Sequence, residues 1–283
     1  MKLSMCTAKL SERFSDKGAI KILCDAGFDA FDFTMKFGYG KDYLAYADEI
    51  KKYADGLGIV CNQAHAPIPS SDSGTEYEEI VHSIEMAARI GAKVIVVHPI
   101  KDRGDGYRWQ KKALFERNMA FFKSLIPHAE KNNIKIAIEN MYSKAPDKNA
   151  IVSGVCSHSE EFCEYIDTLA SEHIVACVDT GHVALVSDTV PNLLGGLGKR
   201  VQALHIHDVD CINDNHALPY TGKLDWNSIC KALAETDYRG DFTYEACNFF
   251  SEQMDDELIP VAAKYAEQVG RNLIRKIETA KQK

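Results

Sequence analysis

Long hydrophobic runs are absent from this sequence of 283 residues, which counts against a membrane-spanning protein. The opening stretch, MKLSMCTAKLSERF, lacks the apolar core of a secretory signal. We therefore expect a cytoplasmic protein with no membrane partner. The formal net charge is −8, and no stripe of Lys and Arg is present, so we expect no nucleic-acid partner.

Close cysteine pairs are also missing. The nine cysteines include no CxxC motif, and their number is odd, which argues against a zinc–thiolate site or a disulfide framework. Several lie inside apolar runs, such as Cys177 in IVACVD, as expected for buried reduced thiols. No glycine-rich phosphate loop follows the first predicted strand, which disfavours a nucleotide-binding open sheet.

Short β-type runs alternate with amphipathic helical segments along the chain. Several of the runs follow a Gly or Asn of the kind that ends a helix. The predicted strands cover residues 2–7, 28–34, 59–65, 93–98, 135–141, 174–179, 201–207 and 241–247. Eight strands alternating with eight helices favour a single (β/α)8 TIM-barrel domain over residues 1–283, with an open doubly wound sheet as the alternative. The longest predicted loops all follow strands, where a barrel has its active site: 66–76, 99–108, 142–157 and 208–225.

Four ligand-type side chains end successive predicted strands. In each case the residue two positions earlier, on the same strand face, is small, whereas the residue between them is larger and mostly apolar. This pattern predicts that the four side chains point into a narrow barrel lumen at its C-terminal mouth. The four are Glu139, Asp179, His205 and Glu245.

Three carboxylates and one imidazole form an oxygen-rich ligand set. Such a set suits one Mn²⁺, Mg²⁺ or Co²⁺ ion, and Zn²⁺ also fits. A carboxylate that binds an ion through one oxygen keeps the other oxygen free as a base. Glu139 and Glu245 are therefore predicted to be catalytic residues as well as metal ligands.

Five further residues are candidates for an additional metal or for substrate. His65 and His98 end the third and fourth predicted strands, where metal ligation, substrate hydrogen bonding and simple burial all remain open. His182 lies three residues after Asp179 and would orient substrate or bind a second ion. Asp214 and His216 form a D-x-H pair that would bind metal, with an Asx turn as the alternative.

Weaker candidates lie further from the strand ends. Lys101 and Arg103 follow the fourth predicted strand and would bind a phosphate or carboxylate, unless this is simply a solvated charged loop. Trp109 would stack on a sugar ring, as would Trp226 and Tyr220, although core packing explains the tryptophans equally well. His207 shares a strand face with His205 but lies further along, which predicts a supporting role rather than ligation.

These motifs together resemble the xylose-isomerase-like TIM-barrel superfamily, which includes sugar-phosphate isomerases, ketose 3-epimerases and apurinic endonucleases. The motifs are HAP, VVHP, IAIEN, VDTGH, LHIHD, LPYTGKLDW and YEA, and the resemblance covers nearly the whole chain. It implies that Glu139, Asp179, His205 and Glu245 hold one divalent ion, often Mn²⁺. It also implies that the two glutamates move a substrate proton, that His182 contacts substrate, and that the protein forms a homo-oligomer.

The sequence matches two branches of that superfamily incompletely. The endonuclease branch holds up to three Zn²⁺ ions, and its nine ligand types all occur here, at His65, His98, Glu139, Asp179, His182, His205, Asp214, His216 and Glu245. The GAH opening of those endonucleases is missing, and the acidic charge does not fit a DNA groove. Ketose 3-epimerases have an arginine and a second glutamate where this chain has Cys211 and Ala145.

The favoured function is a divalent-metal-dependent isomerase or epimerase acting on a small-molecule carbohydrate, either a sugar or a sugar phosphate. A proton would move through a metal-stabilised enediolate, and the sequence does not decide between isomerisation and epimerisation. The alternatives are a trinuclear zinc phosphodiesterase, and a lyase, dehydratase or C-deglycosidase that uses related enolate chemistry.

Overall fold

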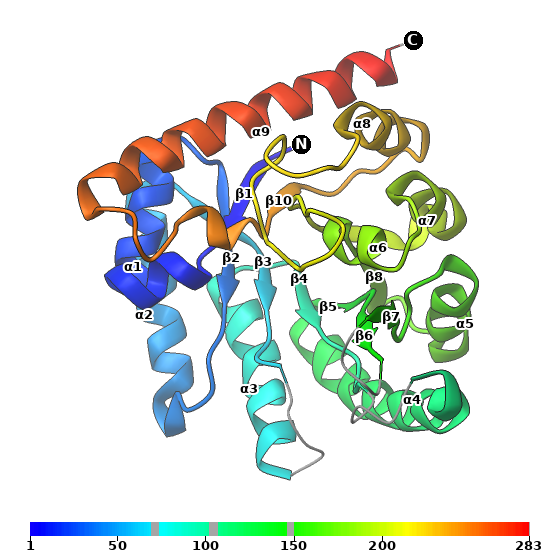
Figure 1. Ribbon diagram of the computed structural model, residues 1–283. Coiled ribbons are helices and arrows are strands. Elements are labelled where there is room, and N and C mark those ends of the chain that lie inside the picture. The colour runs from blue at the N-terminus through cyan, green and yellow to red at the C-terminus, as the bar shows by residue number, and fades with distance from the viewer. Residues whose placement is uncertain (69–73, 102–106, 146–149, 283) are drawn as a thin grey trace.

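The computed structural model describes residues 1–68, 74–101, 107–145 and 150–282, which form a (β/α)8 barrel (Figure 1). Eight parallel strands follow one another in the order β10-β1-β2-β3-β4-β5-β8-β9. They are β1 Leu3–Cys6, β2 Ala30–Thr34, β3 Val60–His65, β4 Val94–Val97, β5 Lys135–Glu139, β8 Ile174–Asp179, β9 Val201–His205 and β10 Phe242–Tyr244. The barrel closes just beyond β9, where the Ile206 N–H donates to the Thr243 carbonyl at 2.9 Å and the Glu245 N–H donates to the Ile206 carbonyl at 3.0 Å.

Helices surround the strands on the outside of the barrel (Figure 1). They are α1 Ala8–Ala26, α2 Tyr43–Leu57, α3 Gly74–Ile90, α4 Tyr107–Asn132, α5 Ser159–Leu169, α6 Thr180–Leu185, α7 Val190–Leu197, α8 Trp226–Glu235 and α9 Ile259–Lys281. Local sequence fixes several of their ends: α1 stops at Gly27, whose φ of 96° suits glycine, and Asp225 caps α8 by accepting from two backbone N–H groups. Within the described ranges, no helix has the length and apolar character that crossing a bilayer requires.

Side chains alternate between the lumen and the outer layer, as the two-residue periodicity predicted. One buried cluster fills the lumen with small or medium side chains: Val94, Val96, Ala137, Val175, Cys177 and Ala203. The intervening Ile138, Val178, Leu204 and Tyr244 belong to the larger cluster between strands and helices. A narrow lumen filled from alternate strand positions explains this size difference. The next inward positions, at the C-terminal strand ends, are the predicted ligands.

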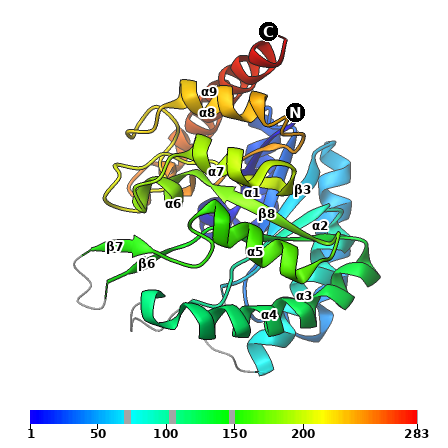
Figure 2. The same ribbon diagram turned by 90° about the vertical axis from the view of Figure 1, so that its right-hand side faces the viewer.

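Two features of the C-terminal face differ from the predicted elements. The segment expected as a loop over 142–157 contains an antiparallel hairpin of β6, Tyr142–Lys144, and β7, Ile151–Ser153. Figure 2 shows that this hairpin projects away from the barrel. The other difference is α6, which begins directly after β8, so the motif DTGH forms the start of a helix. The hairpin was not predicted because strands of three residues are too short to give an alternating pattern in sequence.

Candidate metal centre

The four predicted ligands of one ion meet at the C-terminal mouth of the barrel. Glu139, Asp179 and His205 end β5, β8 and β9, and Glu245 follows β10 directly. Each offers a ligand atom, and these atoms all lie within 4.8 Å of one another. His205 Nδ1 lies 3.1 Å from Glu139 Oε2 and 3.3 Å from Glu245 Oε2. These residues are far apart in sequence. They meet because each occupies an inward-facing position at the C-terminal end of its strand.

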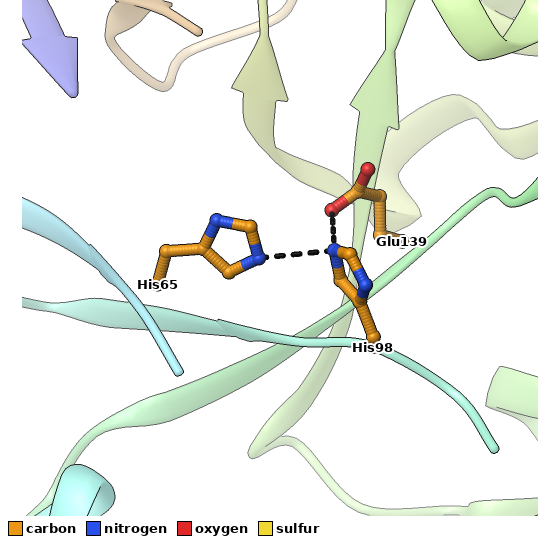
Figure 3. A group of neighbouring side chains, drawn as sticks. All are labelled: His65, His98 and Glu139. Carbon is orange, nitrogen blue, oxygen red and sulfur yellow. Dashed lines mark hydrogen bonds and ion pairs between the residues drawn. The ribbon is translucent and has the colours of Figure 1, made fainter. Parts of the chain in front are cut away.

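His65 and His98 lie next to Glu139 and so extend this centre (Figure 3). His65 Nε2 lies 3.0 Å from His98 Nε2, and His98 Nε2 lies 3.0 Å from Glu139 Oε2. His65 Nδ1 also lies 3.3 Å from Glu245 Oε1. Because two facing ring nitrogens share at most one hydrogen bond, this arrangement is better suited to a cation held between them and Glu139.

A second group of ligand atoms lies next to Asp179. Asp214 Oδ2 lies 3.3 Å from His182 Nε2 and 3.2 Å from His216 Nε2. His207 stacks on His216 at 4.3 Å between ring centroids, and its Nε2 lies 2.9 Å from both oxygens of Asp179. One ligand atom from each of His207, Asp214 and His216 lies within 4.8 Å of the other two, close enough for the three residues to share one ion. His207 is therefore a candidate ligand in the structure, whereas the sequence predicted only a supporting role.

Orphaned polar atoms test whether a divalent cation fits this centre. Both carboxylate oxygens of Glu139, Nδ1 of His205 and Oδ1 of Asp214 are buried without a hydrogen-bond partner among the described residues. Buried polar atoms are normally paired, so such a set needs an explanation. Oxygen and imidazole nitrogen atoms that converge without bonding one another match the coordination preferences of Mn²⁺, Co²⁺ and Zn²⁺. The donor set therefore fits the predicted ion, whose identity stays a prediction.

Charge balance within the centre shifts several pKa values. Burial alone would raise the pKa of Glu139, but the imidazoles of His98 and His205 lower it well below its usual range. Burial would lower the pKa of His182, but the carboxylates of Asp179 and Asp214 raise it well above the ordinary value. The pKa of His205 is raised as well, whereas burial lowers the pKa of His98, so proton uptake in this centre is favoured on His182 and His205.

Metal binding is expected to release protons at neutral pH. The pKa of His216 is raised to about 11, because its hydrogen bond to Asp214 and the nearby Glu245 outweigh the effect of burial, and the pKa of His182 is raised as well. A ring nitrogen must lose its proton before it binds a cation, so the apparent affinity should rise with pH. Calorimetric titration with Zn²⁺ in buffers of different ionisation enthalpy measures the protons released. A heat of binding that is independent of the buffer would contradict this expectation.

Gly181 in the DTGH motif allows His207 to approach Asp179. A Cβ atom at position 181 would clash with the imidazole ring of His207. We expect Gly181→Ala to displace this ring and to destabilise the protein by about 1–3 kcal/mol, the usual cost of overpacking a core. Urea unfolding measures this loss. Gly195→Ala is the control, because a Cβ there meets no atom within 4 Å; equal losses in the two variants would contradict the role assigned to Gly181.

The weaker substrate candidates have mixed outcomes. Lys101 is exposed; burial lowers the pKa of His98, and the charge of Lys101 adds a smaller effect in the same direction. The side chains of Arg103 and Trp109 lie outside the described residues. The prediction that Trp226 stacks on a sugar is wrong. The residue is only 2% exposed, and its Nε1–H donates a hydrogen bond to Asp208 Oδ2 at 2.8 Å. The indole belongs to the core beneath the loop that follows β9.

Two aspartates with clear roles were missed by sequence reasoning. Asp208 accepts hydrogen bonds from the backbone N–H groups of Val209, Tyr220 and Leu224 and thereby organises the loop that contains Asp214. Asp32 on β2 is fully buried beside His205. The signal for Asp32 was present in the run AFDFT, where one charged residue stands between two phenylalanines that face the outer layer.

Comparisons with known proteins agree with this architecture. A family model described as a xylose isomerase-like TIM barrel matches residues 20–268. An uncharacterized protein of Sinorhizobium fredii is 29% identical over 210 residues, which cover 68% of this chain and 64% of that protein, slightly less than two thirds of its length. A D-psicose 3-epimerase of Enterocloster bolteae is 22% identical, with 70% of this chain and 75% of that protein covered. The crystal structure of a D-tagatose 3-epimerase-like protein superposes with a TM-score of 0.75 at 18% identity, over 99% of both chains.

Proposed function

Because this chain belongs to the xylose isomerase-like TIM-barrel family, we propose that it is a divalent-metal-dependent isomerase or epimerase of a sugar or sugar phosphate. The observation that supports the proposal is the convergence of two glutamates, Glu139 and Glu245, with Asp179 and His205 at the barrel mouth. The D-psicose 3-epimerase among its relatives supports the carbohydrate class of substrate. Binding a sugar without reaction would not need two carboxylates facing one point.

The two glutamates differ in exposure, which divides the proposed roles between them. The Glu245 side chain is 13% exposed and that of Glu139 only 1%. Glu245 is therefore the carboxylate that a substrate at the mouth reaches first, and we assign it the removal of the proton next to the carbonyl. Glu139 is assigned the return of a proton, which it would take from the protonated ring of His182, whose Nδ1 lies 3.1 Å from its Oε1. The proton left on Glu245 would then pass to solvent at the mouth of the barrel.

The remaining residues orient and balance these groups. His205 Nδ1 lies within 3.3 Å of a carboxylate oxygen of each glutamate. Their depressed pKa values, caused by surrounding imidazoles that outweigh burial, keep both as bases at neutral pH. A bound divalent ion, with Mn²⁺ favoured and Mg²⁺, Co²⁺ or Zn²⁺ as alternatives, would supply Lewis-acid stabilisation of charge on two adjacent substrate oxygens. Return of the proton to the opposite face would give epimerisation, and return to the neighbouring carbon would give isomerisation.

Hydrogen exchange in D₂O tests the proposed function directly. We expect the Mn²⁺-loaded protein to incorporate deuterium at the carbon next to the carbonyl of at least one ketose or ketose phosphate. Proton NMR of a panel of free and phosphorylated ketoses detects this exchange even where net conversion is small. A chelated sample is the control. Absence of exchange with every ketose, in protein shown to contain the ion, would contradict the proposal.

A trinuclear zinc phosphodiesterase is the second candidate. The specific observation in its favour is that two further ligand groups accompany the central four: His65 and His98 form one with Glu139, and the other consists of His207, Asp214 and His216. Elemental analysis after zinc loading and cleavage of an oligonucleotide with an abasic site separate the two candidates. Three Zn²⁺ per chain together with cleavage would favour the phosphodiesterase, and we expect no cleavage. Enolate chemistry in a lyase, dehydratase or C-deglycosidase would show exchange followed by loss of a substrate group.

A further inference from the structure

Asp32 is a buried carboxylate in the lumen that neither the proposed proton transfer nor the ligand groups use. It lies in the middle of β2, between Phe31 and Phe33, and has no exposed surface. Its side chain points inward, because the two flanking phenylalanines pack in the cluster between strands and helices. The adjacent position on β3 is Gln63, which pairs with Asp32 in the register of the sheet.

Few groups compensate the charge of Asp32. Its Oδ2 accepts a hydrogen bond from Gln63 Nε2 at 2.9 Å. The same oxygen lies at ion-pair distance, 3.5 Å, from Nε2 of His205, and this buried nitrogen has no hydrogen-bond partner among the described residues. Its Oδ1 is buried and has no partner among the described residues. A carboxylate in an apolar lumen is costly unless it is paired, and an apolar side chain at this position would avoid that cost. The group near Asp32 that becomes a cation on protonation is the imidazole ring of His205.

His205 presents its two ring nitrogens to opposite partners. Nδ1 points to the mouth of the barrel, at 3.1 Å from Glu139 and 3.3 Å from Glu245, whereas Nε2 points down the lumen to Asp32. A histidine that binds a cation through one nitrogen needs a proton on the other, and an acceptor for that proton fixes both the tautomer and the ring orientation. Gln63 holds the acceptor in place by its own hydrogen bond to Asp32.

We propose that Asp32 is a positioning residue that accepts the Nε2–H of His205 and so keeps Nδ1 directed at the metal centre. This inference rests on the proposed function, because it gives Asp32 a purpose only if His205 binds an ion. It assigns no contact between Asp32 and substrate. It also explains why a charged residue occupies a lumen position where an apolar residue, such as Val94 on β4 or Ala137 on β5, would avoid the cost of a buried charge.

Direct measurement of metal affinity tests the inference without any assay of activity. Asp32→Asn retains the shape and a neutral acceptor but removes the charge, and we expect Co²⁺ and Mn²⁺ to bind roughly tenfold more weakly. Asp32→Ala removes the acceptor altogether and should cost about a hundredfold. The d–d absorption bands of bound Co²⁺ should shift in both variants, because the imidazole is no longer held in one orientation. Competition with a chromophoric chelator gives the affinities.

Asp16→Asn is the matched control for these variants. Asp16 is also buried, with one oxygen that has no hydrogen-bond partner among the described residues, but it contacts the Tyr46 hydroxyl and, at 3.9 Å, the Lys36 ammonium, and it lies outside the ligand groups. We expect this variant to bind Co²⁺ with wild-type affinity and an unchanged spectrum. If wild-type protein binds Co²⁺ and Asp32→Asn binds it equally tightly with the same spectrum, the inference is overturned and the proposed function stands. If wild-type protein binds none of the ions, both are overturned.

A crystal structure of the wild-type protein with Co²⁺ decides the matter even if the Asp32 variants do not fold. We expect Nδ1 of His205 on the ion and Nε2 within hydrogen-bonding distance of Asp32 Oδ2. An ion bound through Nε2, or an Nε2 that donates to another acceptor, would overturn the inference.

Discussion

Replacing Glu245 by glutamine is expected to slow deuterium exchange into the substrate by about a thousandfold, which is the usual loss when a general base is removed. Glutamine has the same shape as glutamate but an amide that does not take up a proton at neutral pH. Glu245 has the more exposed side chain of the two candidate bases, so we expect the larger loss here rather than at Glu139. Proton NMR in D₂O with saturating Mn²⁺ measures the exchange rate of whichever ketose exchanges with the wild-type protein.

Metal content must be measured in the same samples, because Glu245 is also a predicted ligand. A variant that retains the ion but loses exchange has lost the base, whereas a variant that loses both has lost the site. Glu161→Gln is the matched control, since Glu161 is a buried carboxylate on α5 whose ion-pair partner is Lys111. An exchange rate in Glu245→Gln within threefold of wild type, with the ion bound, would remove Glu245 from the mechanism.

The sequence alone was sufficient to predict the barrel. It was also sufficient to predict where in the barrel the four central residues meet. The reason is the simple periodicity of a strand: Ala137 and Glu139, or Ala203 and His205, share a face, and a small residue at the earlier position indicates a crowded lumen. Parallel strands that end at the same edge then place their last inward side chains together. Neither step needs knowledge of the loops.

The second ligand group was harder to predict for a physical reason. His207 lies beyond the end of β9, where the chain no longer follows the strand, so periodicity does not define its direction. Its approach to Asp179 depends on Gly181, so it involves a contact between the start of α6 and the segment that follows β9. The hairpin of β6 and β7 was missed because pairing between two three-residue strands leaves no pattern in the sequence.

Asp32 shows a different limit of the sequence pattern. A single charged residue in an apolar strand is visible in the sequence, but the partner that explains it is 173 positions away on β9. Ligand-type residues were sought at strand ends, whereas Asp32 acts from the middle of a strand, below the mouth. Only the closed barrel brings β2 and β9, which are not neighbours in the sheet, to one narrow lumen.

Loading with a divalent ion is expected to raise the midpoint of thermal unfolding by roughly 10 °C. An ion that binds the folded chain alone stabilises it by about 4 kcal/mol when present at a thousand times its dissociation constant. For a chain of this size each kcal/mol corresponds to roughly 2–4 °C. The physical source is the set of buried oxygens and ring nitrogens at Glu139, His205 and Asp214 that lack hydrogen-bond partners without the ion. Calorimetry of chelated and Mn²⁺-loaded samples measures the difference.

Asp179→Asn should remove most of that stabilisation while leaving the metal-free fold intact. Asp179 caps α6 by accepting from the His182 N–H, and asparagine caps helices about as well as aspartate. The substitution therefore keeps the cap but replaces an anionic ligand by a neutral one. Asp225→Asn makes the same change at the cap of α8, outside the ligand groups, and should retain the full increase on loading. Equal increases in the two variants would mean that the ion binds without Asp179, and that the central site is not the one that stabilises the barrel.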